Sequence, residues 1–300
     1  MKRFFSLVLL FILLVSTAYA AIPNPIFPLD YDSLEDPPDG VYRYLFTCFD
    51  TWDFKSTNWG NTDGILLVTL DTNQKRVIFT TIMREILVQR PDGGIGRITY
   101  IAKNYGADAL CRLVSTHFGV KVDQYIMFNW DNIQNIIDVL GGVHITVTDA
   151  EAAYLNRYRI SRDSTTPSMN RGGTYLFTGH AAVIYMRIRK VGGDGDVGRS
   201  RRIRTVLQTL VEENRDADLS VAIDLVDSLM NNLCKTNLSM NDIMKAVGAA
   251  LSLRNVEPEG FQLPVNEALD SIHYAGMATN QVDFNLCREE FLSFLSRKPE

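Results

Sequence analysis

Apolar residues recur along this chain at two spacings. One spacing is typical of strands and the other is typical of helices. Alternate apolar residues predict strands, and apolar spacings of three and four residues predict helices. The turn residues Asp71, Thr72 and Asn73 join two of the strands and predict a hairpin. Because strands and helices alternate, the sequence predicts a layered α/β fold. The predicted strands are 42–49, 64–70, 76–82, 125–128 and 144–147, and the predicted helices are 101–118, 130–140, 178–186, 199–214, 219–233, 239–252 and 285–296.

The N-terminal residues depart from this pattern. Lys2 and Arg3 precede an apolar run at 4–15, and small residues then follow at the spacing that a signal peptidase reads. The run is shorter than the roughly 20 residues that span a bilayer, so residues 1–20 predict a signal peptide, with an uncleaved membrane anchor as the alternative. Either one predicts an extracytoplasmic protein, secreted or anchored to the outer face of the cytoplasmic membrane.

The next segment predicts a linker. Residues 21–40 contain five prolines and no sustained period, which is typical of extended chain. A single domain is predicted over 41–300, with a C-terminal part at 216–300 that is expected to be helical.

The charge of the chain excludes one class of partner. Without Lys2 and Arg3, 28 basic residues stand against 35 acidic ones, whereas a nucleic-acid-binding domain is typically basic. The basic residues are nevertheless concentrated between 187 and 204, where only Asp194 and Asp196 oppose them: Arg187, Arg189, Lys190, Arg199, Arg201, Arg202 and Arg204. A basic patch on an acidic protein predicts a confined anionic ligand.

Four cysteines make disulfides plausible in an exported chain: Cys48, Cys111, Cys234 and Cys287. Three connectivities are possible. We favour a bond between Cys234 and Cys287, because both lie in the same C-terminal segment. Four buried free thiols are the alternative.

The arginines have a spacing that suits phosphate. Arg187 and Arg189 would lie on the same side of an extended stretch. Arg199 is predicted at the start of a helix after the glycine-rich loop 191–198, with Arg202 one turn further on the same face. The planar guanidinium binds phosphate oxygens with two donors, and a helix N-terminus adds backbone donors. The pattern therefore predicts a pyrophosphate site, with a solvated basic helix face as the alternative.

Two acidic residues add a possible metal site. Asp50 ends one predicted strand and Asp63 precedes the next, so both are expected at the same edge of the sheet. Magnesium binds a few carboxylates and completes its shell with substrate oxygens and water. Asp50 and Asp63 are therefore the candidate magnesium ligands.

Several segments together resemble the LytR-CpsA-Psr family, also called the cell envelope-related transcriptional attenuator domain. The resemblance covers about 43–215 and is weaker beyond it. Its two most specific blocks, in this order, are an Asp-x-Leu-Gly-Gly-Val segment at 138–143 and an Arg-x-Arg…Gly-Asp-x-Gly-Arg segment at 187–199. The segments that carry it are 49–50, 62–66, 81–85, 97–102, 122–125, 138–143, 179–189 and 195–202.

The resemblance implies a three-layer α/β/α sandwich whose mixed central sheet encloses an apolar slot for a polyprenyl tail. It implies a magnesium-dependent phosphotransferase that moves a phosphate-linked glycopolymer from a polyprenyl-pyrophosphate carrier to peptidoglycan in cell-wall biogenesis, at the membrane surface. It places catalytic roles on Arg84, Arg189 and Asp63, metal binding on Asp50 and Asp63, and phosphate binding on six arginines: Arg84, Arg97, Arg187, Arg189, Arg199 and Arg202. Asp196 is a candidate general base or, alternatively, an ion-pair partner of Arg199.

Three departures from the family pattern favour an alternative function. Thr62 follows Asn61 where an arginine is usual before Asp63, and Ile203 replaces a glutamine. Met83 and Glu85 replace the proline and aspartate that flank Arg84 in the family. The alternative is a non-catalytic protein that binds polyprenyl phosphate or wall glycan as a regulator. Retention of Asp50 and Asp63 favours the enzyme.

Overall fold

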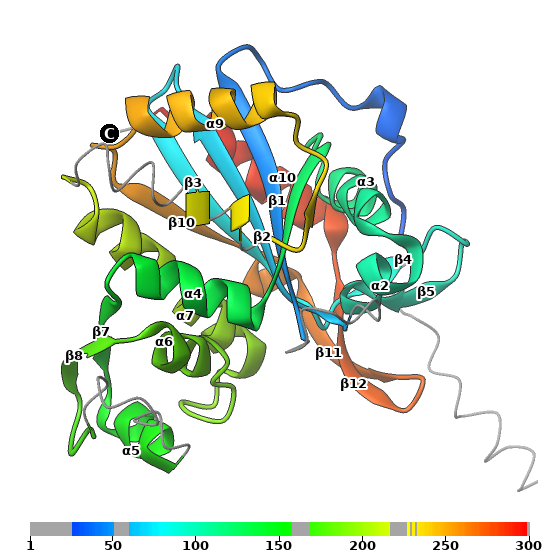
Figure 1. Cartoon of the computed structure of the whole chain (residues 1–300). Coiled ribbons are helices and arrows are strands. Elements are labelled where there is room, and N and C mark those ends of the chain that lie inside the picture. The colour runs from blue at the N-terminus through cyan, green and yellow to red at the C-terminus, as the bar shows by residue number, and fades with distance from the viewer. Residues whose placement is uncertain are drawn as a thin grey trace, which may run out of the picture.

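The chain is built around a six-stranded mixed sheet with the strand order β10-β3-β2-β1-β6-β9 (Figure 1). Here it is described from a computed structural model, for residues 26–50, 60–157, 168–216, 227–228, 230–231 and 233–298. Strands β1 (Val41–Phe49), β2 (Thr62–Asp71) and β3 (Arg76–Ile82) are antiparallel to one another. Strand β6 (Gln124–Asn129) runs parallel to β1, and β10 (Pro258–Leu263) runs parallel to β3. The short strand β9 (Lys235–Thr236) is antiparallel to β6.

Helices cover both faces of this sheet, so the predicted α/β/α layering is confirmed. One face packs against α2 (Ile101–Tyr105), α3 (Ala107–Phe118) and α10 (Phe284–Ser296). The other face packs against α7 (Gly195–Glu213) and α9 (Met240–Ser252). Each strand therefore sends alternate side chains into two different apolar layers.

A third apolar cluster lies beside the sheet, below it in the view of Figure 1. It is formed by helices α4 (Trp130–Val139), α5 (Asp149–Arg157) and α6 (Gly179–Met186) with the hairpin of β7 (Val143–Val147) and β8 (Gly173–Phe177). Two more hairpins, β4 (Leu87–Gln89) with β5 (Ile95–Arg97) and β11 (Leu269–Tyr274) with β12 (Met277–Val282), complete the fold. Short 3-10 turns lie at Tyr31–Ser33, Ile98–Tyr100 and Asn266–Ala268.

The predicted strands and most predicted helices are confirmed, with differences at glycines. The helix expected over 101–118 is two helices, because Gly106 adopts a positive φ of 92° between α2 and α3. The helix at 130–140 ends where expected, since Gly141 and Gly142 both have positive φ. Helix α7 begins at Gly195 rather than at Arg199, so the predicted glycine-rich loop is partly helical.

The C-terminal part is less helical than predicted. Helices α9 and α10 confirm the predictions at 239–252 and 285–296, but strands β9 to β12 lie in the same part of the chain. The pairing of β10 with β3 makes this part an integral portion of the main sheet. Most of the helix expected at 219–233 lies outside the described residues.

The segment predicted as a linker lies along the domain where it is described. From residue 26 to residue 40 it contains one 3-10 turn and no strand. The Leu29 amide donates to the Thr116 carbonyl of α3 at 2.8 Å, and Lys121 pairs with Asp36 at 2.7 Å. The predicted signal segment at 1–20 lies outside the described residues. Among the described helices, none is long and apolar enough to cross a membrane.

The predicted disulfide is wrong, since all four cysteines are free. The Cys234 thiol hydrogen-bonds to the Asn132 side chain at 3.0 Å, beside the edge of the sheet. Cys287 is instead buried on α10, in the layer that packs against α3. Each thiol thus packs in its own environment, and burial raises the pKa of Cys287 to about 12.

Candidate functional site

The candidate site lies at the edge of the sheet where β1 ends and β2 begins. The Asp50 amide donates to the Asn61 carbonyl at 2.9 Å, which holds the two strand ends together across the hairpin. Asp63, the second residue of β2, therefore lies close to Asp50. The structure confirms that these two aspartates share one sheet edge.

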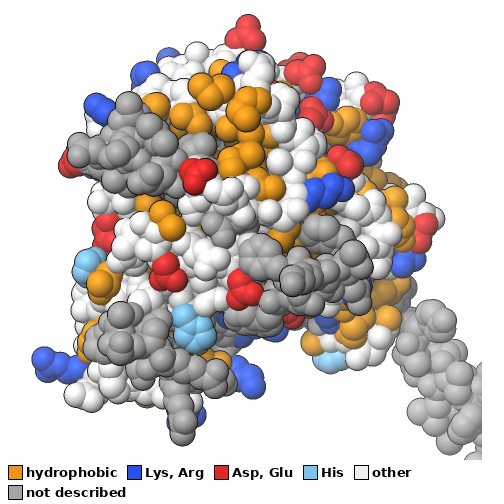
Figure 2. Space-filling view, in the orientation of Figure 1, with side chains coloured by type: hydrophobic (Ala, Val, Ile, Leu, Met, Phe, Trp, Pro, Cys, Tyr) orange, Lys and Arg blue, Asp and Glu red, His pale blue; other side chains and the backbone are white. Residues whose placement is uncertain are grey.

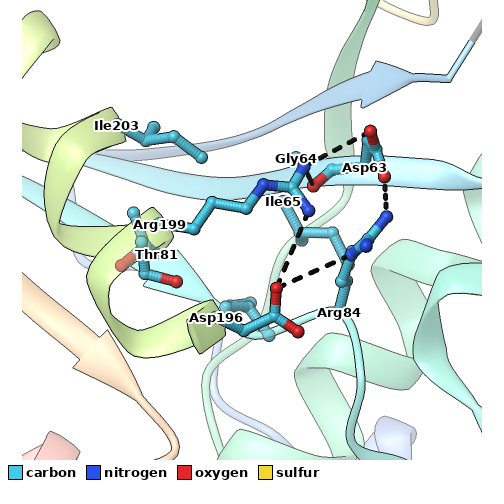
Figure 3. Close-up of a pocket in the computed structure, with 10 residues that line it drawn as sticks. Asp63, Gly64, Ile65, Thr81, Arg84, Asp196, Arg199 and Ile203 are labelled. Atoms are coloured by element: carbon cyan, nitrogen blue, oxygen red, sulfur yellow. Dashed lines mark hydrogen bonds and ion pairs between the residues drawn. The ribbon is translucent and has the colours of Figure 1, made fainter. Parts of the chain in front are cut away.

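Asp63 is the centre of the site. Its side chain is 3% exposed and contacts three arginines. Arg84 Nη1 donates to Oδ1, while Nη2 atoms of Arg187 and Arg199 each lie 3.5 Å from Oδ2. Arg199 also donates to the backbone carbonyl of Asp63. Figure 3 shows the guanidinium groups of Arg84 and Arg199 both directed at Asp63.

Two further acids lie on the other side of these arginines. Asp196 Oδ1 is 3.1 Å from Arg189 Nε and 3.9 Å from both Arg84 Nε and Arg199 Nη1. Glu85 pairs with Arg97 at 2.7 Å, with Arg84 at 3.3 Å and with Arg189 at 3.9 Å. With Asp50, which pairs with Arg187 at 2.9 Å, five guanidinium groups face four carboxylates.

These side chains come from well-separated parts of the fold. Arg84 follows β3, Arg97 ends β5, and Arg187 caps the C-terminus of α6. Arg199 lies in the second turn of α7, and Arg187 also lies over the Trp130 ring at 5.1 Å from its centroid. Since each arginine is fixed by a different element, their mutual distances are set by the whole fold.

The exposed fraction of the side chains increases from the floor of the site to its mouth. Arg199 and Asp63 are 4% and 3% exposed, whereas Arg189 and Asp50 are 45% and 43% exposed. Burial lowers the pKa of Arg199 to about 10, and burial with the nearby Arg199 charge lowers the pKa of Arg84 to about 10. Both guanidinium groups therefore remain protonated at neutral pH.

Several buried polar atoms of the site form no hydrogen bond to any described residue. They are Nε of Arg84, Nε of Arg97, Nε of Arg199 and Oδ1 of Asp196. A buried donor without a partner costs about 1–3 kcal/mol. The three Nε donors are therefore available to an anionic ligand with several oxygens, and binding it would recover that cost.

A small pocket opens between α7 and the ends of β2 and β3 (Figure 3). Its lining changes from charged to apolar, with Arg84, Arg199 and Asp196 near one end and Ile203 further along α7. The complete lining is Asp63, Gly64, Ile65, Thr81, Ile82, Arg84, Asp196, Arg199, Ser200 and Ile203.

The structure brings five of the six predicted arginines together but not Arg202. Arg202 Nε donates to Glu151 of α5 at 2.8 Å, and its other nitrogens donate to the carbonyls of Ile188 and Val191. Its side chain is 3% exposed and holds the loop before α7. Arg202 is therefore a scaffold residue, because the partner acid on α5 turns it away from Asp63.

Two backbone conformations predicted around these arginines are also wrong. The stretch around Arg187 is not extended, because Tyr185 and Met186 are the last residues of α6 and Arg187 has αR backbone angles. Arg199 lies inside α7, so the free backbone donors of the helix start do not adjoin it. Both side chains nonetheless reach Asp63.

Some residues of the site are not identified by the sequence patterns. Glu85 was noted only as a departure from the family, yet it contacts three arginines. Its position directly after Arg84 was the available signal. Thr81 and Ser200 also line the pocket, and nothing in the alternation of β3 or α7 distinguished them from other polar residues.

Asp50 and Asp63 fit a shared cation. A single guanidinium nitrogen, Arg187 Nη2, lies 2.9 Å from Asp50 and 3.5 Å from Asp63. Two carboxylates that face the same cationic nitrogen point to one place, and carboxylate oxygens are ligands that magnesium prefers. Within the described residues, no group of three or more His, Cys, Asp or Glu side chains could hold a metal. Substrate oxygens and water would complete the shell of a magnesium ion here.

Comparison with known proteins identifies the family of this chain. The sequence model of the LytR_cpsA_psr family matches residues 39–288. The chain belongs to this family. Among curated relatives, "Polyisoprenyl-teichoic acid--peptidoglycan teichoic acid transferase TagT" of Bacillus subtilis (strain 168) is 26% identical over 68% of this chain and 61% of its own length. "Biofilm regulatory protein A" of Streptococcus mutans serotype c (strain ATCC 700610 / UA159) is 26% identical over 67% of this chain and 51% of its own length.

Solved structures of family members share the fold. The structure described as "TagT bound to LIIa-WTA" superimposes with a TM-score of 0.69 at 21% sequence identity. The match covers 89% of this chain and 94% of that one. At this identity the likeness establishes the fold alone, and the chain spans less than two thirds of the length of the curated relatives reported above.

Proposed function

We propose that this protein transfers a phosphate-linked glycopolymer from a polyprenyl-pyrophosphate carrier to peptidoglycan, outside the cytoplasmic membrane. The observation that carries the proposal is the set of five arginines around Asp63, Glu85 and Asp196. Several of them have buried Nε donors that form no hydrogen bond to described residues. Arginine forks recognise phosphate oxygens with two donors each. A pyrophosphate has enough oxygens to use several of them at once.

The proposed reaction is a phosphoryl transfer. A hydroxyl of peptidoglycan attacks the sugar-proximal phosphorus and loses its proton to a water molecule, so a new P–O bond forms. The P–O bond to the bridging oxygen breaks, and polyprenyl phosphate leaves with the electron pair. Such reactions depend chiefly on positioning and on charge neutralisation in the transition state. Arg84 and Arg199 at the floor and Arg189 at the mouth are placed to do both.

The apolar layer under α7 and α9 supports a slot for the polyprenyl tail. Leu66 and Val68 of β2 and Phe79 of β3 are 7–9% exposed, whereas Leu45 and Leu67 on the other face are fully buried. The sheet is therefore covered less completely on the α7 and α9 side. Gly64 and Thr81, which line the pocket, lie on this same face by strand alternation. The pocket thus adjoins the apolar layer along β2 and β3.

The outer surface of α9 supports a role at a membrane. Met240 and Met244 are 69% and 63% exposed, one turn apart, and Leu251 continues the same side of the helix. Figure 2 shows hydrophobic side chains gathered in the region of α9. An exposed apolar patch of this kind is typical of contact with lipid or protein. We propose that this side of the protein faces the membrane from which the carrier lipid comes.

Magnesium is the proposed cofactor, held by Asp50 and Asp63. When bound, the ion would supply charge neutralisation to the phosphate oxygens. Arg187 would then turn from the two aspartates to the substrate. Asp196, surrounded by Arg84, Arg189 and Arg199, is assigned to ion pairing rather than to proton transfer.

The names of relatives favour both this function and its alternative. TagT is named as a transferase from polyisoprenyl-teichoic acid to peptidoglycan, whereas Biofilm regulatory protein A is named as a regulator. A lipid- or glycan-binding regulator would need the arginines and the slot but not the paired aspartates. Both aspartates are present at the sheet edge, which favours the enzyme.

The decisive experiment uses the full chain in detergent with a polyprenyl-pyrophosphate-linked oligosaccharide and peptidoglycan fragments. We expect mass spectrometry to detect phosphate-linked oligosaccharide on peptidoglycan and an equal amount of released polyprenyl phosphate. EDTA should abolish both products, and added magnesium should restore them. Saturable lipid binding with no product under any metal condition would establish the binding protein instead.

A further inference from the structure

Arg204 lies beside the pocket, outside the set of arginines that the motifs identify. It follows Ile203, which lines the pocket, and lies one helical turn beyond Ser200, which also lines it. Its Nη1 donates to the hydroxyl of Thr81, another lining residue, and lies 3.4 Å from the Phe261 carbonyl of β10. The guanidinium is therefore held against the wall of the pocket, between α7, β3 and β10.

The charge of Arg204 is not balanced as the other charges are. Arg84, Arg97, Arg187, Arg189 and Arg199 each lie within 4 Å of at least one carboxylate. Among the described residues, Arg204 forms no ion pair, and its two hydrogen-bond acceptors are both neutral. Burial, with a smaller effect of the nearby Arg201, lowers the pKa of Arg204 to about 10. An anion therefore stabilises this partly buried, unpaired cation more than it would stabilise a cation that already has an ion-pair partner.

The position of Arg204 along α7 indicates which anion. Towards the start of the helix lie Arg199 and the charged part of the site. Towards its end, Leu207 and Val211 pack into the apolar layer against the sheet. Arg204 lies between the two, at the boundary from charged pocket to apolar layer. In a polyprenyl pyrophosphate, the group at that boundary is the phosphate that carries the lipid chain.

We propose that Arg204 binds the lipid-proximal phosphate of the carrier, the phosphate that leaves with the polyprenyl chain. This inference rests on the proposed function and adds a residue to its binding site. Ile203, which lines the pocket at this point, is apolar and offers no hydrogen-bond donor. Arg204 supplies a charged donor at the neighbouring position. In the transfer step it would stabilise the negative charge that develops on the leaving phosphate.

The surroundings of Arg204 offer a second way to disturb it. A Cβ atom on Gly260 of β10 would lie 3.2 Å from Arg204 Cδ and 3.3 Å from its Nε. The glycine thus leaves the room that the arginine side chain occupies. Gly260→Ala keeps the charge of Arg204 but forces its side chain to shift by a few tenths of an ångström.

The test measures binding of two probes to the full chain in detergent: a polyprenyl monophosphate and inorganic pyrophosphate. Arg204→Ala should weaken binding of the monophosphate by about 10- to 100-fold, the range for a lost hydrogen bond to a charged group. Pyrophosphate should be affected less, since it can occupy the site of the other five arginines. Arg204→Lys should recover part of the loss, and Gly260→Ala should reproduce part of it.

The matched control is Arg201→Ala, which makes the same charge change on the same helix. Arg201 is 60% exposed and pairs with Asp194, away from the pocket. Equal weakening by Arg201→Ala and Arg204→Ala would show a diffuse charge effect and overturn the proposal. Unchanged monophosphate binding by folded Arg204→Ala would also overturn the proposal. If the wild-type chain binds both probes in that case, the proposed function still stands. Failure of the wild-type chain to bind either probe would instead overturn the proposed function itself.

Discussion

Two groups of buried arginines in this protein differ in how many of their N–H donors form hydrogen bonds within the protein. Arg76 of β3 donates from Nε and Nη2 to both oxygens of Glu259, at 2.7 and 2.8 Å. Its remaining donors bind the last carbonyls of α10 and the residue after it, those of Phe294, Leu295 and Arg297. Arg202 is likewise bonded through Nε, Nη1 and Nη2. Both arginines join elements that are distant in the sequence.

The arginines of the site are arranged in the opposite way. Several of their ion pairs are 3.3–3.9 Å long, and the buried Nε atoms of Arg84, Arg97 and Arg199 form no hydrogen bond to any described residue. The Asp196 oxygen that faces Arg84, Arg189 and Arg199 has ion pairs of 3.1–3.9 Å but likewise forms no hydrogen bond to any described residue. A scaffold would not gain from such an arrangement. A binding site that exchanges internal ion pairs for contacts with substrate phosphate does gain from it, because its donors are already in place.

The largest expected effect tests whether the site formed by these arginines and aspartates is catalytic. Asp50→Asn removes one proposed metal ligand at an exposed position, so the fold should be unaffected. Magnesium-dependent transfer should fall by about a thousandfold or more, because a metal at the phosphates contributes several kcal/mol to the barrier. Product formation is followed by mass spectrometry. Binding of pyrophosphate without metal should be kept or tightened, since a negative charge beside Arg187 is lost.

Asp39→Asn is the control for this change, because Asp39 is also exposed but lies at the other end of β1. It should leave transfer unchanged. Full magnesium-dependent transfer by Asp50→Asn would remove Asp50 from the metal site.

The second effect tests the scaffold group. Arg202→Ala leaves Glu151 as an unpaired buried charge, so the free energy of unfolding should fall by about 3–5 kcal/mol. Urea denaturation measures this. Arg201→Ala, at the exposed neighbouring position, should change the free energy of unfolding by less than about 0.5 kcal/mol. Similar stability for both variants would contradict the scaffold role of Arg202.

The third effect should separate binding from stability. Arg189→Ala removes a proposed phosphate contact at the mouth of the site, where the side chain is 45% exposed. Pyrophosphate binding, measured by calorimetry, should weaken by about 1.5–3 kcal/mol. The free energy of unfolding should change by less than about 0.5 kcal/mol, as for other surface changes. Arg254→Ala, an exposed arginine after α9, serves as the control, and an equal loss of binding there would favour a diffuse basic surface.

The sequence predicted the members of the site better than their individual roles. The motif positions of Arg84, Arg187, Arg189 and Arg199 led to residues that the structure brings together. Motif order identified them even where the predicted backbone conformation was wrong. Arg199 and Arg202 cannot be separated in this way, since both are arginines of one motif on one helix. Their difference comes from Glu151 of α5, an element that the apolar pattern did not reveal.

The C-terminal strands escaped prediction for a related reason. Strand β10 has the sequence PEGFQL, in which proline and glycine argue against a strand. It is a strand because it pairs with β3 over its whole length. Tertiary pairing of this kind leaves no periodic signal in the segment itself. The C-terminal helices α9 and α10 were predictable, since their apolar spacing is local.

The smallest expected effect is a loss of less than about 2 kcal/mol at Leu66, compared with its neighbour Leu67 in the opposite apolar layer. Leu66 and Leu67 are neighbours on β2 that point to opposite faces of the sheet. Leu67 is fully buried against α2, α3 and α10, whereas Leu66 is 9% exposed in the layer under α7 and α9. Leu67→Ala should lower the free energy of unfolding by about 2–5 kcal/mol, and Leu66→Ala by less than about 2 kcal/mol, because an incompletely covered position loses fewer contacts. Urea denaturation of the two variants provides the measurement. Equal losses would mean that both layers are packed equally tightly, and the layer under α7 and α9 would then have no room for a polyprenyl tail.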